Sequence, residues 1–198
     1  MKSFSRIAAV VFVGLSLCAP GFASEAWVID ANHSDASFRV RHFVSKVSGR
    51  FNEMAGEVMI DEADPSKSSV TFTIKTASID TANERRDGHL KSADFFDVET
   101  HPEITFKSTA IEKKSDSKFD VEGELTMHGV TKKVVLPVEF MGVMGDKAGF
   151  SIRTEIERKD YGIIWNRALD EGGYVLGDEV DVEINLELNK KKEEAEES

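Results

Sequence analysis

The segment Val180-Asp181-Val182-Glu183-Ile184-Asn185-Leu186-Glu187-Leu188 alternates apolar and polar residues without a break. Successive side chains of a β-strand point to opposite faces, so this pattern predicts a strand with one buried face and one face in water. Five shorter segments earlier in the chain show the same period of two residues. They are Ser37–His42, Val70–Lys75, Ile104–Ser108, Phe119–Leu125 and Phe150–Ile156.

Two further segments are expected as strands although their pattern is imperfect. In Phe51–Asp61 the apolar residues fall on both faces, and a bulge near Gly56 would bring them into register. Val134–Met144 alternates well but contains Pro137, which lacks the N–H that a central strand donates. Pro137 therefore predicts a sheet edge or a bulge at this point.

Short turn signals separate these strands, and helical segments are missing between most of them. We expect about eight strands in an antiparallel meander. Closing such a sheet into a barrel removes its edges, whereas packing two sheets leaves them exposed. The predicted fold is therefore all-β: an eight-stranded antiparallel up-and-down barrel, whose interior is filled by side chains or holds one slim ligand.

Residues 1–23 have the pattern of a secretory signal peptide. A basic start is followed by the apolar run Ile7–Leu17 and by a small-x-small sequence that ends at Ala23. The run is too short for a membrane span. The single cysteine, Cys18, follows Leu17, where a lipoprotein site requires a small residue, so cleavage after Ala23 is favoured.

The remaining chain predicts one domain, residues 24–189, followed by a charged tail, residues 190–198. Without Cys18 the exported protein has no disulfide, so its core alone must stabilise the fold. The net charge of −11 argues against a nucleic-acid partner. Export through the signal peptide predicts a periplasmic location.

Phenylalanine dominates the predicted interior. The chain has thirteen phenylalanines and two tyrosines, and phenylalanine adds bulk without a hydroxyl group that needs a hydrogen bond. Two interpretations stay open on this pattern. The residues fill a packed core, or they surround a cavity that holds a lipid.

The sequence gives no motif for a metal, a cofactor or catalysis. Its five histidines lack the spacing of a zinc site, and no nucleophile elbow or glycine-rich phosphate loop is present. The acidic residues fall mainly at outward strand positions, as solvated charges do. We therefore expect a protein that is not an enzyme and that has no cofactor.

The long interruption Ile79–Thr109 differs from the strands. A short helix is predicted near residues 83–95, capped by Asn83 or Thr81, and tertiary contacts must hold it because Gly88 disfavours helix. Arg86 shares a helix face with Leu90 and Arg85 with His89, and Phe95-Phe96 follow. The segment could close one barrel end and face the charged head of an amphiphile, or be a surface helix that its phenylalanines anchor.

Several motifs occur together, in order, between Trp27 and about Leu188. They are Trp27-Val28-Ile29-Asp30, Phe38-Arg39-Val40-Arg41-His42, Ser78-Ile79-Asp80-Thr81, Arg86-Asp87-Gly88-His89-Leu90-Lys91-Ser92-Ala93-Asp94-Phe95-Phe96-Asp97, Gly123-Glu124-Leu125-Thr126-Met127-His128-Gly129 and Arg158-Lys159-Asp160-Tyr161-Gly162-Ile163 with Trp165. In these motifs the chain resembles the YceI-like family of exported, lipocalin-like, polyisoprenoid-binding proteins. Tyr161 stands where the family usually has phenylalanine, and Lys133 where proline often follows Thr-Lys.

The resemblance implies a barrel extended relative to ordinary lipocalins, with a long apolar tunnel for an isoprenoid or another long-chain amphiphile. It also implies candidate ligand-binding residues. The apolar wall is expected from Phe38, Val40, His42, Phe72, Ile74, Phe106, Phe150 and Trp165. Arg86, His89 and Asp94 are expected at the polar mouth or as residues that fix the helix, and Asn166 is also expected at the mouth.

Three functions remain in view. The first is periplasmic binding, transport or storage of an isoprenoid or fatty-chain lipid. The second is a stress-related structural or partner-binding barrel that lacks a lipid cavity. The third is an enzyme that acts on a bound lipid through His89 or His42, although no nucleophile accompanies them. A homodimer that forms through an edge strand is also possible.

Overall fold

The computed structural model describes residues 24–169 and 173–191, so the predicted signal peptide lies outside the described residues. These residues form eleven strands, one α-helix and three short 3₁₀ helices. The strands are β1 (Glu25–Ile29), β2 (Asp35–His42), β3 (Ser45–Phe51), β4 (Met54–Ile60), β5 (Ser69–Lys75), β6 (Ile79–Asp80), β7 (Glu103–Lys113), β8 (Lys118–Met127), β9 (Val130–Met144), β10 (Lys147–Glu157) and β11 (Leu176–Lys190). The helices are η1 (Pro65–Lys67), η2 (Thr76–Ser78), α1 (Glu84–Lys91) and η3 (Arg158–Tyr161).

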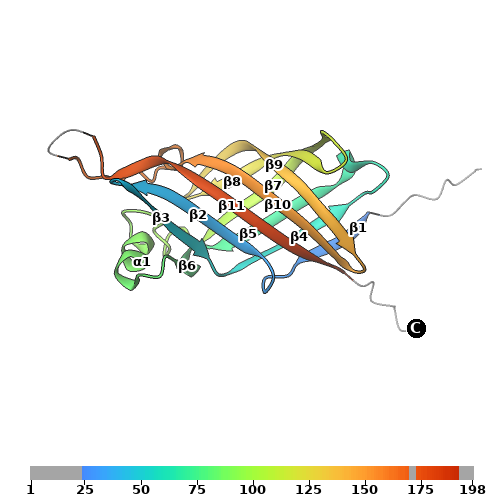
Figure 1. Ribbon diagram of the computed structural model, residues 1–198, viewed down its shortest axis with the longest axis horizontal. Coiled ribbons are helices and arrows are strands. Elements are labelled where there is room, and N and C mark those ends of the chain that lie inside the picture. Colours follow the sequence, from blue (N-terminus) through green and yellow to red (C-terminus); the bar gives the residue numbers. More distant parts are fainter. Residues whose placement is uncertain (1–23, 170–172, 192–198) are drawn as a thin grey trace, which may run out of the picture.

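The strands form a closed antiparallel barrel, as the alternation predicts (Figure 1). The order β1-β4-β5-β7-β8-β9-β10-β11 closes on itself because β11 also pairs with β1. The C-terminal end of β11 pairs with β1, whereas the rest of β11 pairs with β2. On its other side β2 pairs with β3, which continues the ring. Since β1 and β2 share one position, as do β3 and β4, and β5 and β6, the ring has eight positions and is long for its width.

The strand with the clearest alternation lies where the sequence predicts. In β11, Ile184 is 9% exposed and Leu188 is fully buried, whereas Asp181 and Asn185 face solvent. The strand extends to Lys190, which pairs with Trp27, so the ordered barrel includes the first residue of the predicted tail. No helix among the described residues is long and apolar enough to cross a membrane.

The predicted bulge near Gly56 is wrong. A bend at Asn52 and Glu53 divides the segment into β3 and β4, and β4 then pairs with β5 in unbroken register. The bend explains why Phe51 is out of phase with β4, whereas Met59 lies on the face of β4 opposite Val58. Gly56 has another role, because a Cβ atom there would lie 2.5 Å from the carbonyl oxygen of Thr71 on the neighbouring strand.

Pro137 lies where the prediction expects an irregularity. The ladder between β9 and β10 ends at Val138, and its register shifts between Gly149 and Phe150, where β9 has one extra residue, Met141. Beyond that point the first half of β9 pairs only with β8. Here η3 lies against β9: Lys132 forms an ion pair with Asp160, 2.7 Å apart, and Tyr161 is buried.

The predicted helix is real but shorter than residues 83–95. Asn83 caps α1, because its side chain accepts a hydrogen bond from the Arg86 N–H at 3.0 Å. The helix ends at Lys91, since Ser92 is extended and its hydroxyl group donates to the carbonyl oxygen of His89. The chain then turns, which allows Phe95 to be buried beneath the helix.

Candidate functional site

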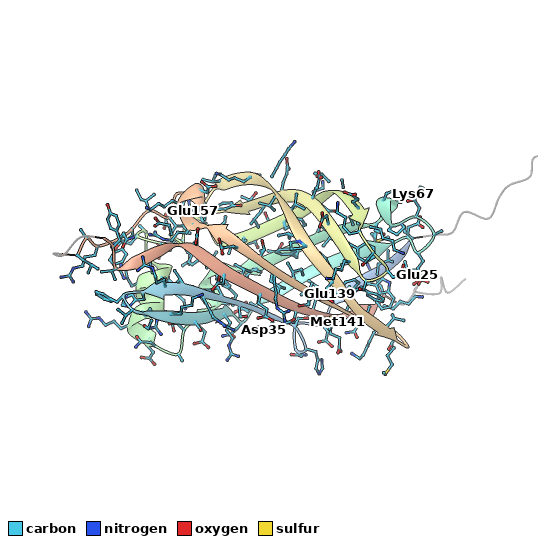
Figure 2. All side chains as sticks on the ribbon, turned by 45° about the horizontal axis from the view of Figure 1, so that its top comes forward. Glu25, Asp35, Lys67, Glu139, Met141 and Glu157 are labelled. Atoms are coloured by element: carbon cyan, nitrogen blue, oxygen red, sulfur yellow. The ribbon has the colours of Figure 1, made fainter. Side chains whose placement is uncertain are left out.

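Two apolar cavities lie inside the barrel. The β1-end cavity has a volume of about 360 Å³ and the α1-end cavity about 260 Å³. Four residues line both cavities, so these side chains lie between the two spaces: Phe72, Ile74, Leu136 and Ile184. Figure 1 shows α1 at one end of the long barrel and β1 toward the other. In Figure 2, Glu25 and Lys67 mark the end opposite the one toward which Glu157 lies.

Alternating strands build the cavity walls. Facing residues on paired strands place their side chains on the same side of the sheet, and Phe72 pairs with Phe106 in this way. Their rings stack with centroids 5.3 Å apart at the junction of the two cavities. Gly123 makes room for this stack, because a Cβ atom there would lie 2.4 Å from the Phe106 ring.

The structure places all eight predicted wall residues on the cavity surfaces. Phe38, Val40, His42 and Trp165 line the α1-end cavity. Phe106 and Phe150 line the β1-end cavity, and Phe72 and Ile74 line both. Residues from four strands, β2, β5, β7 and β10, and one loop are thus brought together along the interior surface.

The four predicted mouth residues divide into two pairs. Arg86 and His89 line the α1-end cavity, whereas Asp94 and Asn166 do not. Asp94 lies beside the cavity wall and is hydrogen-bonded to His89, with Oδ2 and Nε2 2.9 Å apart. Asn166 clamps Leu176: its amide donates to the Leu176 carbonyl oxygen and its Oδ1 accepts from the Leu176 N–H.

An aromatic cluster forms the wall beneath α1. The His89 ring meets Phe95 and Trp165 edge to face, each with centroids 5.0 Å apart, and Phe95 lies 5.2 Å from Trp165. The hydrogen bond that Asp94 accepts from His89 Nε2 fixes the orientation of this imidazole. The insertion therefore contributes both a ring surface and polar groups to the α1-end cavity.

Arg86 has donor capacity left at the cavity. Its Nε donates to Thr81 Oγ1 and its Nη2 to the Thr81 carbonyl oxygen, both at 2.7 Å. Its Nη1 makes no hydrogen bond to a described residue. Thr81 thus holds the guanidinium group rather than capping the helix. A planar cation with a free N–H group is well suited to an anionic or carbonyl head.

Arg158 is a cavity residue that the prediction missed. It is 4% exposed and donates four hydrogen bonds, to the carbonyl oxygens of Gly177, Ile163 and Trp165 and to Asp178. Desolvation lowers the pKa of the guanidinium, and Asp178 opposes that effect. The period of two in β10 puts residue 158 on the inward face, so the sequence did contain a signal for its burial.

The two cavity mouths carry opposite charges. The ionisable residues that line the α1-end cavity are His42, Arg86, His89 and Arg158, and none of its described lining residues is acidic. The β1-end cavity is lined by Asp61, Glu62 and Asp116, with Lys113 the one cation in its described lining. Alternation does not reveal this difference, because the turns that carry these acids are not periodic.

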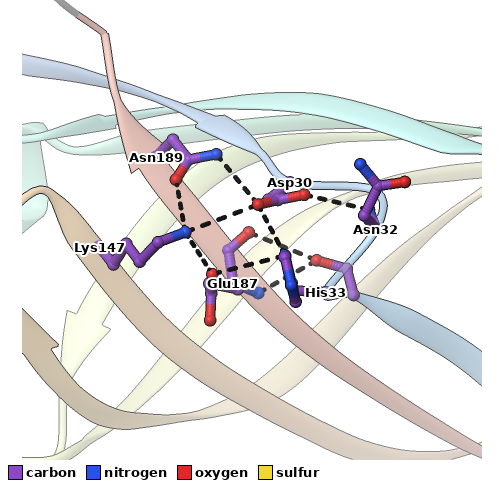
Figure 3. Close-up of polar contacts among 7 residues, drawn as sticks. Asp30, Asn32, His33, Lys147, Glu187 and Asn189 are labelled. Carbon is purple, nitrogen blue, oxygen red and sulfur yellow. Dashed lines mark hydrogen bonds and ion pairs between the residues drawn. The ribbon is translucent and has the colours of Figure 1, made fainter.

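A polar network lies at the seam where β11 changes partner (Figure 3). His33 Nδ1 and Asp30 Oδ2 are 2.9 Å apart, and the three potential metal ligands Asp30, His33 and Glu187 lie within 4.8 Å of one another. Lys147 Nζ is already 2.5 Å from Glu187 and 3.0 Å from Asn189. An ammonium group thus supplies the positive charge there, and the network ties β1, β10 and β11 together.

Asp30 is the most perturbed acid of this network. The hydrogen bond from His33 is the largest cause that lowers its pKa, to about 2 from 3.8. Burial opposes the shift, and Asn189 and the Asn32 N–H add to it. The seam therefore favours an ionised Asp30 in the folded protein.

Comparisons with known proteins agree with this architecture. The model of the YceI-like domain matches residues 27–188. A UPF0312 protein of Vibrio cholerae is 38% identical over 176 residues, which cover 84% of this chain and 89% of that protein.

Two solved structures show the same barrel. The Campylobacter jejuni YceI protein is 32% identical with a TM-score of 0.65, and the match covers 75% of this chain and 88% of that one. A polyisoprenoid-binding domain from Saccharophagus degradans, implicated in plant cell wall breakdown, has a TM-score of 0.68 at 17% identity, covering 84% and 99% of the two chains. The family model and the Vibrio relative confirm the resemblance seen in the sequence: the chain belongs to the YceI-like domain family.

Proposed function

We propose that the protein binds one long-chain amphiphile of the isoprenoid class, with its apolar chain along the two cavities and its polar head at the α1 end. The observation that carries the proposal is the pair of neighbouring apolar cavities that share Phe72, Ile74, Leu136 and Ile184 in their walls. A slim chain that passes between these four side chains fills both spaces, whereas a compact ring system fills one.

Burial supplies the binding free energy. Removing apolar surface from water contributes about 25 cal/mol per Å², so a chain enclosed by phenylalanine and aliphatic side chains needs few polar contacts. The interior spaces of about 360 and 260 Å³ favour this proposal over the second function, a barrel without a lipid cavity.

The charges at the two ends favour one orientation. A phosphate or carboxylate head would meet Arg86 and His89 at the α1 end but Asp61, Glu62 and Asp116 at the β1 end. Opposite charges attract strongly where water is partly excluded. The head therefore belongs at the α1 end, with the chain directed toward β1.

Two further observations support the proposal. A domain with this fold is described as polyisoprenoid-binding, although at 17% identity the likeness shows the fold alone. The signal-peptide pattern of residues 1–23 favours a role in the periplasm, where a long apolar chain needs a carrier to leave a membrane. Cell fractionation tests the location: periplasmic protein without residues 1–23 is expected, and cytoplasmic protein of full mass would contradict it.

The direct test is extraction of the purified protein with organic solvent, followed by mass spectrometry. We expect a long-chain lipid at close to one molecule per protein, and renewed binding of an added isoprenoid phosphate after extraction. An empty extract combined with no uptake of the added lipid would refute the proposal.

A pair of variants separates cavity binding from adsorption to the surface. Phe72→Trp enlarges a side chain at the cavity junction and is expected to lower lipid uptake at least several-fold. Thr71→Trp adds an indole to the exposed face of the same strand and is expected to bind like the wild type. Equal uptake by both variants would mean that the lipid does not occupy the cavities.

A further inference from the structure

The turn between β2 and β3 exposes two large apolar side chains. Val44 is 103% exposed and Phe43 is 47% exposed. Phe43 also has a φ of 52°, in the left-handed region that a glycine or asparagine adopts far more easily. Exposure of the ring to water and the positive φ angle both disfavour phenylalanine at position 43. The stability of the fold therefore does not explain the presence of this residue.

More exposed apolar side chains lie at the same end. Tyr174 is 54% exposed and precedes Val175, whose carbonyl oxygen accepts a hydrogen bond from the Phe43 N–H at 2.8 Å. Ile164 is 70% exposed and precedes Trp165, a residue of the α1-end cavity wall. Apolar side chains thus project from the barrel end that contains the mouth of that cavity.

The hairpin that carries this turn is strongly basic. Residues 39–50 contain Arg39, Arg41, Lys46 and Arg50 and no acidic residue, in a chain whose net charge is −11. All four cations are exposed. Lys46 and Arg50 form ion pairs with acids of neighbouring strands, whereas Arg39 and Arg41 form none with a described residue.

The inward face of the same hairpin is a cavity wall. Phe38, Val40, His42 and Val47 line the α1-end cavity, two residues or fewer from outward cations. An apolar tip flanked by cations is the pattern of proteins that insert side chains into the interface of an anionic membrane.

We propose that the α1 end docks on an anionic phospholipid bilayer, with Phe43 and Val44 among the acyl chains near the head groups and Arg39, Arg41 and Lys46 at the lipid phosphates. The docked protein presents the mouth of the α1-end cavity to the membrane. This last point rests on the proposed lipid-binding function, whereas docking itself does not.

The β1 end provides a matched control. The end of β9 also exposes apolar side chains, since Met144 is 84% exposed and Met141 is 66% exposed. Here Glu139 and Asp146 lie nearby in the chain, acids line the cavity mouth, and the neighbouring cations Lys147 and Lys190 are already paired with Glu187 and Glu25. An anionic surface repels this end, so exposure of apolar side chains alone does not make it a docking surface.

Co-sedimentation with vesicles tests the proposal. Protein expressed in a bacterium from the full-length sequence is mixed with one of two kinds of vesicle. The anionic vesicles contain equal parts phosphatidylcholine and phosphatidylglycerol, and the neutral vesicles contain phosphatidylcholine alone. We expect binding to the anionic vesicles, and about tenfold weaker binding by Val44→Asp. Met144→Asp is expected to bind like the wild type. Residues 1–23, if retained, are common to all variants, so these comparisons isolate the hairpin.

The charges are tested separately. The double change Arg41→Ser with Lys46→Ser is expected to weaken binding to anionic vesicles by about tenfold, and ionic strength of about 0.5 M to have a similar effect on the wild type. The docking proposal is overturned if the wild type does not bind, if Val44→Asp binds equally well, or if Met144→Asp weakens binding as much. Binding only to an acidic protein partner would likewise overturn it.

Lipid uptake distinguishes docking from cavity binding. With isoprenoid phosphate supplied in detergent, Val44→Asp is expected to load as the wild type does. With the same lipid supplied in anionic vesicles, its loading is expected to be about tenfold slower. If neither the wild type nor Val44→Asp takes up the lipid from detergent, the proposed function is contradicted. If both take it up from anionic vesicles at the same rate, docking alone is contradicted.

Discussion

The two ends of the barrel share the same strands but differ in what closes them. At the β1 end, Trp27, Val58, Ala148 and Leu188 form a compact apolar cluster, and the network around Lys147 ties the strands at the seam. At the α1 end, closure depends on non-strand segments: α1, η3 and the loop that contains Trp165. The strands thus form most of the cavity walls, and the segments between the strands contribute most of the charged and polar groups that line the cavities.

The largest expected effect of a single change concerns the residue that holds the α1-end segments in place. Arg158→Met removes four hydrogen bonds, leaves three carbonyl oxygens without their donor, and leaves Asp178 with the exposed Lys159 as its partner. We expect the free energy of unfolding to fall by about 3 kcal/mol in urea titrations.

Lys159→Ala is the matched control. Lys159 also contacts Asp178, at 2.7 Å, but it is exposed, and exposed ion pairs contribute about 0–1 kcal/mol. Similar losses for the two variants would show that burial of Arg158 does not organise this end of the barrel.

The charge difference between the mouths predicts an effect on affinity. Arg86→Gln removes the cation of the α1-end mouth, and we expect an isoprenoid phosphate to bind about tenfold more weakly in a fluorescence titration. Lys113→Gln makes the matching change at the β1 end and is expected to alter affinity by less than about twofold. A larger loss of affinity for Lys113→Gln than for Arg86→Gln would indicate that the head of the ligand lies at the β1 end, which contradicts the proposed orientation.

The helix cap gives a smaller effect on stability. Asn83→Ala removes the acceptor for the Arg86 N–H and is expected to destabilise the protein by about 1 kcal/mol. Hydrogen exchange should rise in α1 and remain unchanged in β11, because the cap holds only the α1 end. Equally faster exchange in both elements would contradict a local role for the cap.

The smallest effect belongs to the seam at the β1 end. The folded-state pKa of Asp30, about 2, lies below its ordinary value of 3.8, so its ionisation stabilises the fold above about pH 4 and this contribution disappears as the pH falls toward 2. Asp30→Asn should therefore be less stable than the wild type near neutral pH, and the difference should vanish in acid. Thermal melts across this range measure it; a difference that persists at pH 2 would assign the effect to something other than charge.

The sequence predicted the barrel because alternation is a local property that each strand carries by itself. Alternation also placed seven of the eight wall residues on the inward face, whereas Trp165, which lies in a loop, was expected from the family resemblance. The sequence also predicted the cap at Asn83 and the irregularity at Pro137, since both follow from the chemistry of a single residue.

Predictions failed where the outcome depends on contacts between distant segments. Asp94 and Asn166 lie beside the cavity rather than on it, because each is held by a partner that pattern alone does not identify: His89 for Asp94 and Leu176 for Asn166. The network around Lys147 joins residues from three strands that are far apart in the chain, and the burial of Arg158 depends on carbonyl oxygens of later loops.

The two tryptophans of the chain lie at opposite ends of the two cavities, Trp27 at the β1 end and Trp165 at the α1 end. Isoprenoid phosphates that carry bromine either beside the head or at the chain terminus can therefore report the position of the ligand by quenching fluorescence. Trp27→Phe and Trp165→Phe leave one emitter each. We predict that bromine at the head quenches Trp165 more strongly and bromine at the chain terminus quenches Trp27 more strongly. Absence of quenching at both sites, or the reverse order, would contradict a lipid bound along the barrel with its head at α1.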